Sequence, residues 1–532
     1  MIDLIIKNGK IIDGTGEPPY TSDIAVDNGK IIQIGDSSSL NSKKTYDVTG
    51  KIVTPGFIDI HTHSDFPLFV DGSAQSGIRQ GLTTAVIGNC GLGPAPAPNK
   101  ELTKQITIGV KDEWGIDFNW NSFEEYLNAL ISKGQSLNIA ALIPHSTIRL
   151  AVMGFEAREP TSKELEMMKS LVDHAMSAGA IGLSTGLEYS PGLHAKEDEI
   201  IALTKIVSKY GGIYASHIRQ RGDLFEKAVE EALNIAKVAG VQAQLSHLAP
   251  RPYAPKDSFD NILQLIYKFI DNYGPVGIDT FPDPWGPAYL LDLAPTWIRE
   301  GTEEDVLKRL SDPSFLMEET KDYFENPTNF LLKIGGFETF FLTHSNSHAN
   351  LIGKSIENIA YDWSTSPIEA IFKLAYDDGK DFGNVLIRHI FATQEDLDKL
   401  IKQPICSIES DGASTSKEGL LKDLVMNRSS FGYAPRFIKE YALDRKIISL
   451  EEAIRKLTSL PAKSAKLHSR GTLKPQMAAD IVILDISKLK DNTTDNNPQE
   501  YPSGIDLVTV NGKIVFESNI HLGTLSGELI KL

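Results

Sequence analysis

Apolar, β-branched runs alternate with short polar breaks at both ends of the chain. Asn-Gly pairs stand at three of these breaks, namely Asn8-Gly9, Asn28-Gly29 and Asn511-Gly512. An Asn-Gly pair supplies the two positive-φ residues of a tight turn, so each pattern predicts a β-hairpin. Three unrelated hairpins would also satisfy the pattern, but one domain built from both ends explains it better. We therefore expect a small β-sandwich domain made of residues 1–54 and 470–532.

The middle of the chain has a different pattern, in which short apolar runs alternate with stretches of helical spacing. Two of the apolar runs end at His217 and His247. Residues 223–240 lie between them, and their apolar positions recur at helical spacing before a final glycine. Such strand–helix alternation favours a parallel α/β fold. Residues 55–469 are therefore predicted to form a TIM-like (β/α)8 barrel.

Residues 284–350 interrupt this alternation. They contain Trp285 and Trp297 together with many charged residues at helical spacing. We expect an insertion or lid over the mouth of the barrel. His344 and His348 lie in it and could approach a substrate, although a surface or structural role is the commoner explanation for such histidines.

Composition narrows the possible functions of the 532-residue chain. Its net charge of −17 argues against nucleic-acid binding, which needs basic patches. It has no run of about 20 apolar residues and no signal-peptide pattern at its start, so we expect a cytoplasmic protein that does not cross a membrane. Only two cysteines are present, Cys90 and Cys406, which excludes a disulfide framework and favours a reducing compartment.

Possible metal ligands follow several of the predicted strands. His61 and His63 are two residues apart after an apolar run, so both imidazoles can reach one ion. Cys90 ends another strand beside a glycine-rich loop, and a thiolate ligand favours zinc over magnesium or calcium. His217 and His247 end two further strands. Because catalytic residues of such barrels lie at the carboxyl ends of the strands, we expect these side chains to converge.

Asp411 completes the set of six candidate ligands. It follows the apolar run 405–408 in a Ser-Asp-Gly motif, although an Asp-Gly pair is equally typical of a simple turn. A free cysteine is usually a small core residue, which is our interpretation of Cys406. Six ligands exceed the three that one catalytic zinc usually has, so they could hold two ions with one shared ligand.

Zinc lowers the pKa of a bound water to about 7, which provides hydroxide at neutral pH. An aspartate beside that water could accept its proton and pass it to a leaving nitrogen. The six residues therefore indicate hydrolysis of a C–N amide bond, with Asp411 as the proton carrier.

Taken together, the motifs resemble the N-acyl-D-amino-acid deacylase (D-aminoacylase) family of the amidohydrolase superfamily. The resemblance extends over nearly the whole chain. The segments that carry it are residues 55–65 (PGFIDIHTHSD), 81–91 (GLTTAVIGNCG), 182–192 (GLSTGLEYSPG), 246–247 (SH) and 410–412 (SDG).

The resemblance implies roles for the candidate residues. Cys90, His217 and His247 would bind one tight zinc ion, whereas His61, His63 and Asp411 would line a second, weaker metal position. Asp411 would act as the general base and then as the general acid. Tyr189 would polarise the scissile carbonyl through its hydroxyl, although a packed aromatic beside a Pro-Gly turn is a close alternative.

The chain departs from the family pattern where the substrate carboxylate is bound. The family's lysine two residues after the second histidine is Ala249 here, and the tyrosines of its Asp-x-Tyr-Pro-Tyr stretch are Phe281 and Asp283. The family's His-Pro-Arg motif is also absent near residues 427–430. The metal centre is thus retained, while carboxylate recognition is altered.

Three arginines could compensate for the lost lysine: Arg219, Arg251 and Arg428. The expected substrate is a small-molecule amide, most simply an N-acyl (D-)amino acid. A cyclic amide, a dipeptide or a carboxylate-free hydrophobic amide is the alternative. A non-catalytic scaffold relative is disfavoured because all six ligands are present, and a homo-oligomer remains an open expectation.

Overall fold

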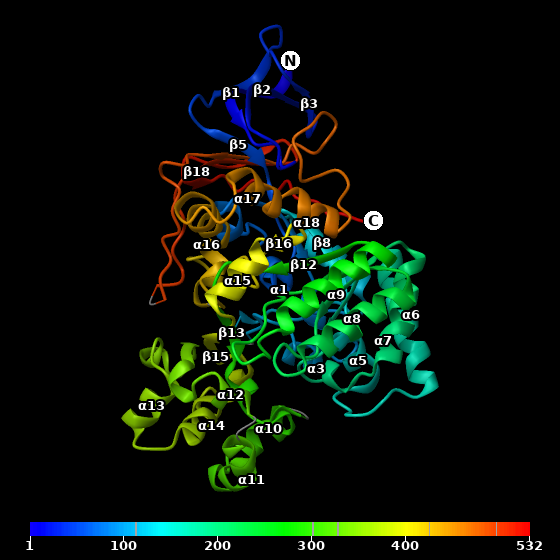
Figure 1. Ribbon diagram of the computed structural model, residues 1–532, viewed down its shortest axis with the longest axis vertical. Coiled ribbons are helices and arrows are strands. Elements are labelled where there is room, and N and C mark those ends of the chain that lie inside the picture. Colours follow the sequence, from blue (N-terminus) through cyan, green and yellow to red (C-terminus); the bar gives the residue numbers. More distant parts are fainter. Residues whose placement is uncertain (112–113, 301–302, 327–328, 425, 496) are drawn as a thin grey trace.

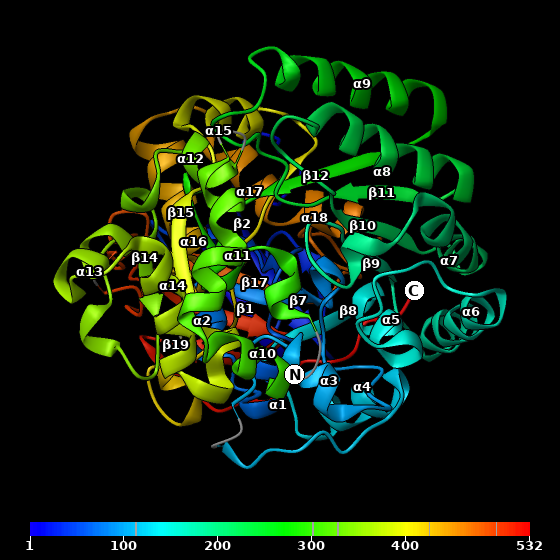
Figure 2. The same cartoon turned by 90° about the horizontal axis from the view of Figure 1, so that it is seen from below.

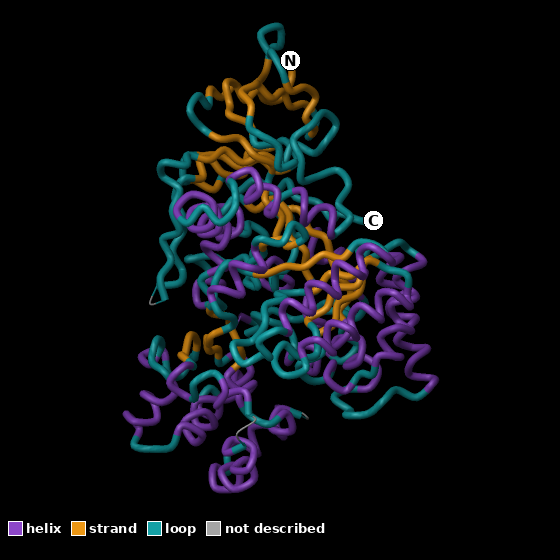
Figure 3. Tube along the Cα trace, in the orientation of Figure 1, coloured by secondary structure: helices purple, strands orange, loops and turns teal. Residues whose placement is uncertain are grey.

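The computed structural model describes residues 1–111, 114–300, 303–326, 329–424, 426–495 and 497–532. Three parts follow one another along the longest axis of the molecule (Figure 1): a β-domain formed by both chain ends, a central barrel and an insertion. Figure 3 shows how they differ, because strands dominate the end that carries the N-terminus and helices dominate the opposite end.

The β-domain contains one nine-stranded sheet with the order β20-β19-β18-β17-β5-β1-β2-β3, and β4 pairs with β1. Its strands are β1 (Ile2–Ile11), β2 (Tyr20–Asp27), β3 (Lys30–Ile34), β4 (Ser42–Asp47), β5 (Ile52–Pro55), β17 (Ile481–Leu484), β18 (Ile505–Val510), β19 (Lys513–Glu517) and β20 (Ile520–His521). The two chain ends meet where β5 pairs antiparallel with β17. Leu4, Ile24 and Val53 share one apolar core with Ile481 and Leu507, so the sheet folds over residues from both ends. This confirms a β-domain made from the two termini.

Two of the three predicted Asn-Gly hairpins are present. Asn28 and Gly29 join β2 to β3 with φ angles of 48° and 76°. Asn511 and Gly512 join β18 to β19 with φ angles of 49° and 74°. Both pairs have the two left-handed residues that this type of turn requires.

The hairpin predicted at Asn8-Gly9 is wrong. Both residues lie inside the continuous strand β1, whose register with β2 shifts between Ile6 and Gly9. Only Asn8 has a positive φ, 60°, and its backbone N–H donates to Asp23 at 2.9 Å. A Cβ atom on Gly9 would lie 2.5 Å from Val53 Cγ2. The pair is therefore a β-bulge, and close packing rather than a turn requires the glycine.

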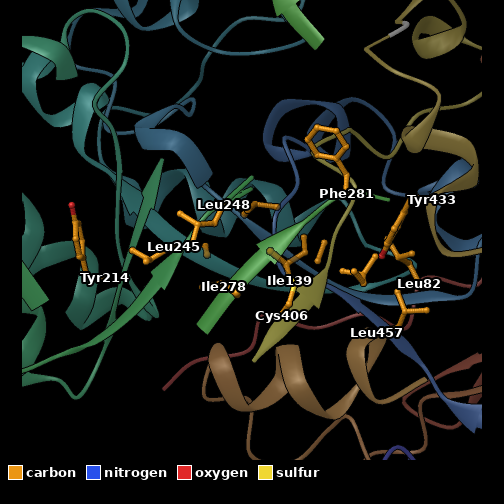
Figure 4. Close-up of a cluster of buried hydrophobic side chains, with 14 of the residues drawn as sticks. Leu82, Ile139, Tyr214, Leu245, Leu248, Ile278, Phe281, Cys406, Tyr433 and Leu457 are labelled. Carbon is orange, nitrogen blue, oxygen red and sulfur yellow. The ribbon is translucent and has the colours of Figure 1, made fainter. Parts of the chain in front are cut away.

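The central barrel is an eight-stranded parallel sheet with the order β16-β12-β11-β10-β9-β8-β7-β6. Its strands are β6 (Phe57–Asp59), β7 (Leu82–Ile87), β8 (Asn138–Pro144), β9 (Gly182–Gly186), β10 (Ile213–His217), β11 (Gln242–Leu245), β12 (Val276–Thr280) and β16 (Cys406–Ile408). This agrees with the predicted TIM-like barrel. Figure 4 shows Ile139, Leu245, Ile278 and Cys406 in its buried apolar cluster, and Cys406 is fully buried as expected of a core residue.

The first and last barrel strands are joined just beyond their carboxyl ends. Thr62, after β6, forms a parallel bridge with Gly412, after β16. The His63 N–H donates to the Gly412 carbonyl at 2.7 Å, and the Asp411 N–H donates to the His61 carbonyl at 3.2 Å. The closure therefore brings residues 61–63 against residues 411–412.

Helices cover the outside of the barrel. They are α1 (Asp65–Val70), α2 (Gln75–Arg79), α3 (Lys100–Gln105), α4 (Phe123–Ser132), α5 (His145–Met153), α6 (Ser162–Ala178), α7 (Glu197–Lys209), α8 (Phe225–Ala239), α9 (Ser258–Tyr273), α15 (Gln394–Ile401), α16 (Ser429–Arg436), α17 (Leu450–Leu457) and α18 (Ser459–Ser464). In Figure 2, helices α5 to α9 lie outside strands β8 to β12. The helix predicted within residues 223–240 is α8, which buries its apolar face and ends at Gly240 with a φ of 73°.

The insertion has an apolar core of its own. A three-stranded sheet, β13 (Trp285–Tyr289), β15 (Leu386–Ile390) and β14 (Phe341–His344), carries the helices α10 (Glu303–Leu310), α11 (Pro313–Glu325), α12 (Phe330–Lys333), α13 (Ile356–Trp363) and α14 (Pro367–Asp377). Leu290, Phe340 and Ile387 belong to this second core. It therefore extends well beyond residue 350. None of the helices in the described part of the chain has both the length and the apolar character needed to cross a bilayer.

Candidate metal centre

The six candidate ligands lie at the carboxyl ends of the barrel strands. His217 is the last residue of β10, and His247 follows β11 by two residues. Cys90 and Asp411 each stand three residues beyond a strand, β7 and β16 respectively. His61 and His63 follow β6. Because all barrel strands are parallel, these positions meet at one mouth of the barrel.

The Cys90 thiol lies at the centre of three imidazoles. Its Sγ is 3.1 Å from His61 Nε2, 3.6 Å from His247 Nε2 and 3.7 Å from His217 Nδ1. The ligand atoms of His61, Cys90 and His247 all lie within 4.8 Å of one another, as a shared ion would require. One sulfur and several nitrogen donors around a common point suit zinc.

A second group of ligands shares His61 with the first. Asp411 Oδ1 lies 3.3 Å from His63 Nε2 and 3.6 Å from His61 Nε2. These three ligand atoms also lie within 4.8 Å of one another. The two groups together form a site that could hold two neighbouring ions.

Three of the six residues have strained backbones. Cys90, His247 and Asp411 have positive φ angles of 55°, 34° and 42°, although none of them is a glycine. Such conformations cost about 1–3 kcal/mol each and persist where the surrounding structure enforces them. Strain at three strand ends around the same mouth of the barrel indicates that the backbone is shaped to aim these side chains.

Protonation states in the cluster suit metal binding. Burial lowers the pKa of His61 to about 3 and that of His247 well below its usual value. Burial alone would raise the pKa of Asp411, but its hydrogen bond with His63 and the charge of His61 bring it to about 2. His61 and His247 are thus neutral imidazoles and Asp411 is a charged carboxylate, the forms that bind metals.

The chemistry of the Cys90 thiol and the orientation of two histidine rings also fit an ion. Burial, followed by the charge of Asp411, raises the pKa of Cys90 well above its usual value. A bound zinc would reverse that shift, since a coordinating thiol is deprotonated. His61 and His247 face Cys90 with Nε2, whereas their Nδ1 atoms, which have no hydrogen-bond partner among the described residues, lie on the other edge of each ring. The residues present therefore fit zinc.

Three buried carboxylates accept hydrogen bonds from the backbone of the cluster, a role that the sequence motifs did not predict. Asp59 Oδ1 accepts from the His61 N–H at 3.3 Å, and Asp279 Oδ1 accepts from the His247 N–H at 2.6 Å. Glu409 accepts from the Asp411 N–H. Burial raises the pKa of Asp59 and of Asp279 to about 7. Acidic residues within otherwise apolar strands were the available signal for this supporting layer.

Tyr189 lies beside the metal ligands. Its hydroxyl donates to the Cys90 carbonyl at 2.7 Å, and its ring packs edge-on against His217 with 5.1 Å between centroids. A Cβ atom on Gly186 would lie 2.2 Å from this hydroxyl. Gly186 therefore makes room for the tyrosine at the site.

Comparison with known protein families identifies the family of this chain. The model of the amidohydrolase family matches residues 44–239 and 376–516, which is more than half of the chain. The chain belongs to the amidohydrolase family.

Individual relatives of this amidohydrolase match over their full length. An N-acyl-D-glutamate deacylase of Alcaligenes xylosoxydans xylosoxydans is 28% identical over 522 residues, which cover 97% of this chain and 94% of that protein. A solved N-acyl-D-glutamate deacylase of Bordetella bronchiseptica, complexed with zinc and a phosphonate mimic of the tetrahedral intermediate, has a TM-score of 0.82 at 27% identity over 100% of both chains. A solved D-aminoacylase, described for one-metal activation and second-metal attenuation of its binuclear centre, has a TM-score of 0.80 at 28% identity, again over 100% of both chains. The family resemblance is thereby confirmed.

The predicted substrate-binding residues of this amidohydrolase are scattered. Within the described residues, no hydrogen bond or ion pair joins Arg219, Arg428, His344 or His348 to the six candidate ligands. Arg219 pairs with Glu231 at 2.8 Å, Arg428 with Asp283 at 2.6 Å and His348 with Asp377 at 2.8 Å. His344 is buried in β14, and burial followed by the Lys111 charge lowers its pKa to about 4.

Arg251 is nearer to the centre, together with Glu188 and Arg221, which were not among the predicted site residues. Glu188 accepts a hydrogen bond from His217 Nε2 at 2.8 Å. Arg251 and Arg221 approach the Glu188 carboxylate at 3.5 Å and 3.6 Å. A signal was available, because Arg221 and Arg251 each stand four residues after a candidate metal-binding histidine, His217 and His247 respectively.

Proposed function

We propose that this amidohydrolase is a zinc-dependent deacylase that hydrolyses the amide bond of an N-acyl amino acid, with preference for the D form. The observation that carries the proposal is the convergence of Cys90, three imidazoles and Asp411 at the mouth of the barrel. Full-length similarity to an N-acyl-D-glutamate deacylase supports the substrate class.

The ligands divide between two metal positions in this proposal. Cys90, His217 and His247 hold the tight zinc, and His61, His63 and Asp411 line the weaker position. When bound, zinc supplies Lewis acidity and lowers the pKa of a water to about 7. The short contacts that His61 makes with both Cys90 and Asp411 support a shared boundary between the positions.

Asp411 carries the proton in the reaction. Its carboxylate is ionised and part-exposed beside His63, so it can accept a proton from the attacking water. It then donates that proton to the leaving nitrogen. The Tyr189 hydroxyl, now on the Cys90 carbonyl, turns to the scissile carbonyl oxygen of the substrate and stabilises the charge that develops there.

The domain limits form part of the same proposal. Residues 1–54 and 470–532 make the β-domain, residues 55–469 make the hydrolase barrel, and residues 284–350 belong to a lid. The separate apolar core of the insertion supports its acting as one body. Two buried free thiols, Cys90 and Cys406, support a cytoplasmic location.

A second candidate substrate class is an amide without a free carboxylate, including cyclic amides and dipeptides with a blocked end. Ala249 favours it, because this small apolar residue replaces the lysine that the family uses to bind a carboxylate.

Hydrolysis of a small amide panel by the zinc-loaded enzyme tests the proposal. The panel contains N-acetyl-D- and N-acetyl-L-amino acids, the matching carboxamides and several cyclic amides. Faster turnover of the free D acids is the expected result. Faster turnover of carboxamides or cyclic amides would favour the second class, and no hydrolysis of any member would refute the proposed function.

A further inference from the structure

A compact cluster of charged residues lies directly beside the metal ligand His217. Glu188 Oε2 is 2.8 Å from His217 Nε2, on the opposite side of the ring from the Nδ1 atom that faces Cys90. Arg221 and Arg251 approach the two oxygens of Glu188, Arg221 Nη2 at 3.6 Å from Oε2 and Arg251 Nη2 at 3.5 Å from Oε1. One carboxylate thus faces two guanidinium groups.

Both guanidinium groups are held in fixed positions. Arg221 Nη1 donates to the His247 carbonyl at 3.1 Å, and Arg251 Nη1 donates to His389 Nε2 at 3.3 Å. The two groups also stack over the ring of Phe391, at 4.6 Å and 5.8 Å from its centroid. A planar guanidinium that is already ordered loses little entropy when it binds a carboxylate.

The charges in this cluster do not balance. Arg221 and Arg251 contribute two positive charges, and Glu188 contributes one negative charge. Burial lowers the pKa of His389 to about 3, so its ring adds no charge. The negative charges of Asp411 and Cys90 also attract Arg221, but both residues are candidate metal ligands, so a bound metal ion would balance their charges. One positive charge therefore remains uncompensated in a place where burial makes such a charge costly.

Free hydrogen-bonding capacity accompanies the excess charge. Arg221 is 4% exposed and its Nε atom has no hydrogen-bond partner among the described residues. Glu188 is 29% exposed and Arg251 is 11% exposed, so the cluster is open on one side. A buried guanidinium with an unused donor is incomplete without an acceptor.

We propose that Arg221 and Arg251, positioned by Glu188, form an anion subsite that binds the free carboxylate of the substrate one side chain away from the metal centre. This inference rests on the proposed function and assigns its specificity to two residues. In this proposal the two arginines take over the role of the lost lysine. Arg221 stands four residues after His217, and Arg251 stands four residues after His247. Glu188 pairs with both arginines and also accepts a hydrogen bond from His217, so it joins the subsite to a proposed zinc ligand.

The first test measures binding without turnover. Zinc-loaded Asp411→Asn protein is titrated calorimetrically with N-acetyl-D-alanine, N-acetyl-D-leucine and N-acetyl-D-glutamate and with their carboxamides. Arg251→Met in this background is expected to weaken binding of the acids about 30-fold while it leaves binding of the carboxamides within about threefold. Arg221→Met should act in the same direction. Arg158→Gln, which removes a surface arginine paired with Glu164, is the matched control and should change neither.

The second test separates recognition from chemistry in the otherwise unchanged enzyme. Arg251→Met should raise KM for the acids about 30-fold and leave kcat within about threefold, and Arg251→Lys should recover part of the loss. Equal losses on acids and carboxamides, or unchanged acid binding, would overturn the subsite. Zinc content is measured for each variant, so that loss of the metal is recognised directly.

The two proposals can fail separately. An enzyme that binds the acids through Arg251 but hydrolyses none of the amides retains the subsite and loses the proposed function. An enzyme that hydrolyses carboxamides with full activity and binds no acid retains amide hydrolysis and loses the subsite. Tighter binding of a cationic amide, such as N-acetyl-D-lysinamide, would instead assign Glu188 to the substrate and overturn the anion subsite.

Discussion

The strand ends of the barrel carry the candidate metal ligands, whereas the loops that follow them carry the two arginines of the proposed anion subsite. The two groups of residues are held in place in different ways. Cys90, His217 and His247 are positioned by the backbone at the carboxyl ends of strands β7, β10 and β11, and two of them, Cys90 and His247, have strained φ angles. Arg221 and Arg251 lie on loops and are positioned mainly by side-chain partners, Glu188, His389 and Phe391, with one further hydrogen bond from Arg221 to the His247 carbonyl. The reactive centre can therefore stay constant while recognition changes through a few loop residues.

Removing the proton carrier should have the largest effect. Asp411→Asn keeps the shape of the side chain but cannot accept a proton from water, so kcat should fall about a thousandfold. Steady-state rates on the amide panel measure this loss. The tight zinc and the circular dichroism should remain those of the parent enzyme, and turnover within tenfold of the parent would refute the role assigned to Asp411.

The second-largest effect is expected when Cys90 is removed, and Cys406 provides the matched control. Cys90→Ala removes the sulfur at the centre of three imidazoles and should cost about one zinc ion per chain. Cys406→Ala changes a fully buried core residue of β16, so it should lower stability by about 1 kcal/mol and leave the zinc content intact. Metal analysis after dialysis and thermal unfolding distinguish the two. Equal zinc in both variants would remove Cys90 from the ligand set.

A buried ion pair in the helical shell should affect stability without affecting chemistry. Glu199, in α7, lies 2.8 Å from His145 Nε2 and also pairs with Arg149. Burial opposes its ionisation, but the hydrogen bond from His145 and the Arg149 charge lower its pKa below the usual value. Glu199→Gln leaves Arg149 without its buried counter-charge and should reduce the free energy of unfolding by about 3 kcal/mol.

The stabilisation from Glu199 should depend on pH in a defined direction. Because the folded-state pKa is lowered, the stabilisation is present above the pKa of the unfolded chain and is lost as pH falls through the folded value. Denaturant unfolding at pH 7 should therefore separate Glu199→Gln from the parent, and the difference should shrink in acid. A difference that grows in acid would contradict this assignment.

The smallest effect is expected in the β-domain. Gly9→Ala would place a Cβ atom 2.5 Å from Val53 Cγ2, which should lower the free energy of unfolding by about 2 kcal/mol with kcat/KM unchanged. Gly383→Ala is the control, since nothing lies within 4 Å of its added Cβ. Changed kinetics in Gly9→Ala would mean that the β-domain influences the metal centre.

Sequence alone was sufficient wherever the backbone dictates the position of a side chain. Period-two and helical patterns located the strands and α8, and strand ends then identified Cys90, His217 and His247 as neighbours because parallel strands share one mouth. The turn at Asn28-Gly29 followed from local chemistry in the same way, since two left-handed residues specify it.

Side chains placed by tertiary packing could not be identified from the sequence. The partners of Arg219 and Arg428 are acidic residues distant in the chain, Glu231 and Asp283, and no local pattern indicates which arginine is already paired. Glu188 could not be identified because its partners are distant in the chain: His217 at the end of β10, and Arg221 and Arg251 on two different loops. Asn8-Gly9 has the composition of a turn, but Val53 and the register with β2 make it a bulge.

The bridge between Thr62 and Gly412 has a consequence for biosynthesis. A ribosome that adds about 5–20 residues per second makes the partner of Thr62 tens of seconds after Thr62 itself. The strand that pairs with β5 is made later still, because it begins at Ile481. A nascent chain therefore carries His61 and His63 long before Asp411 is synthesised. During that time strand β5 also lacks its partner β17. Closing the barrel and bringing Asp411 to His61 and His63 are therefore among the last events in the making of this enzyme.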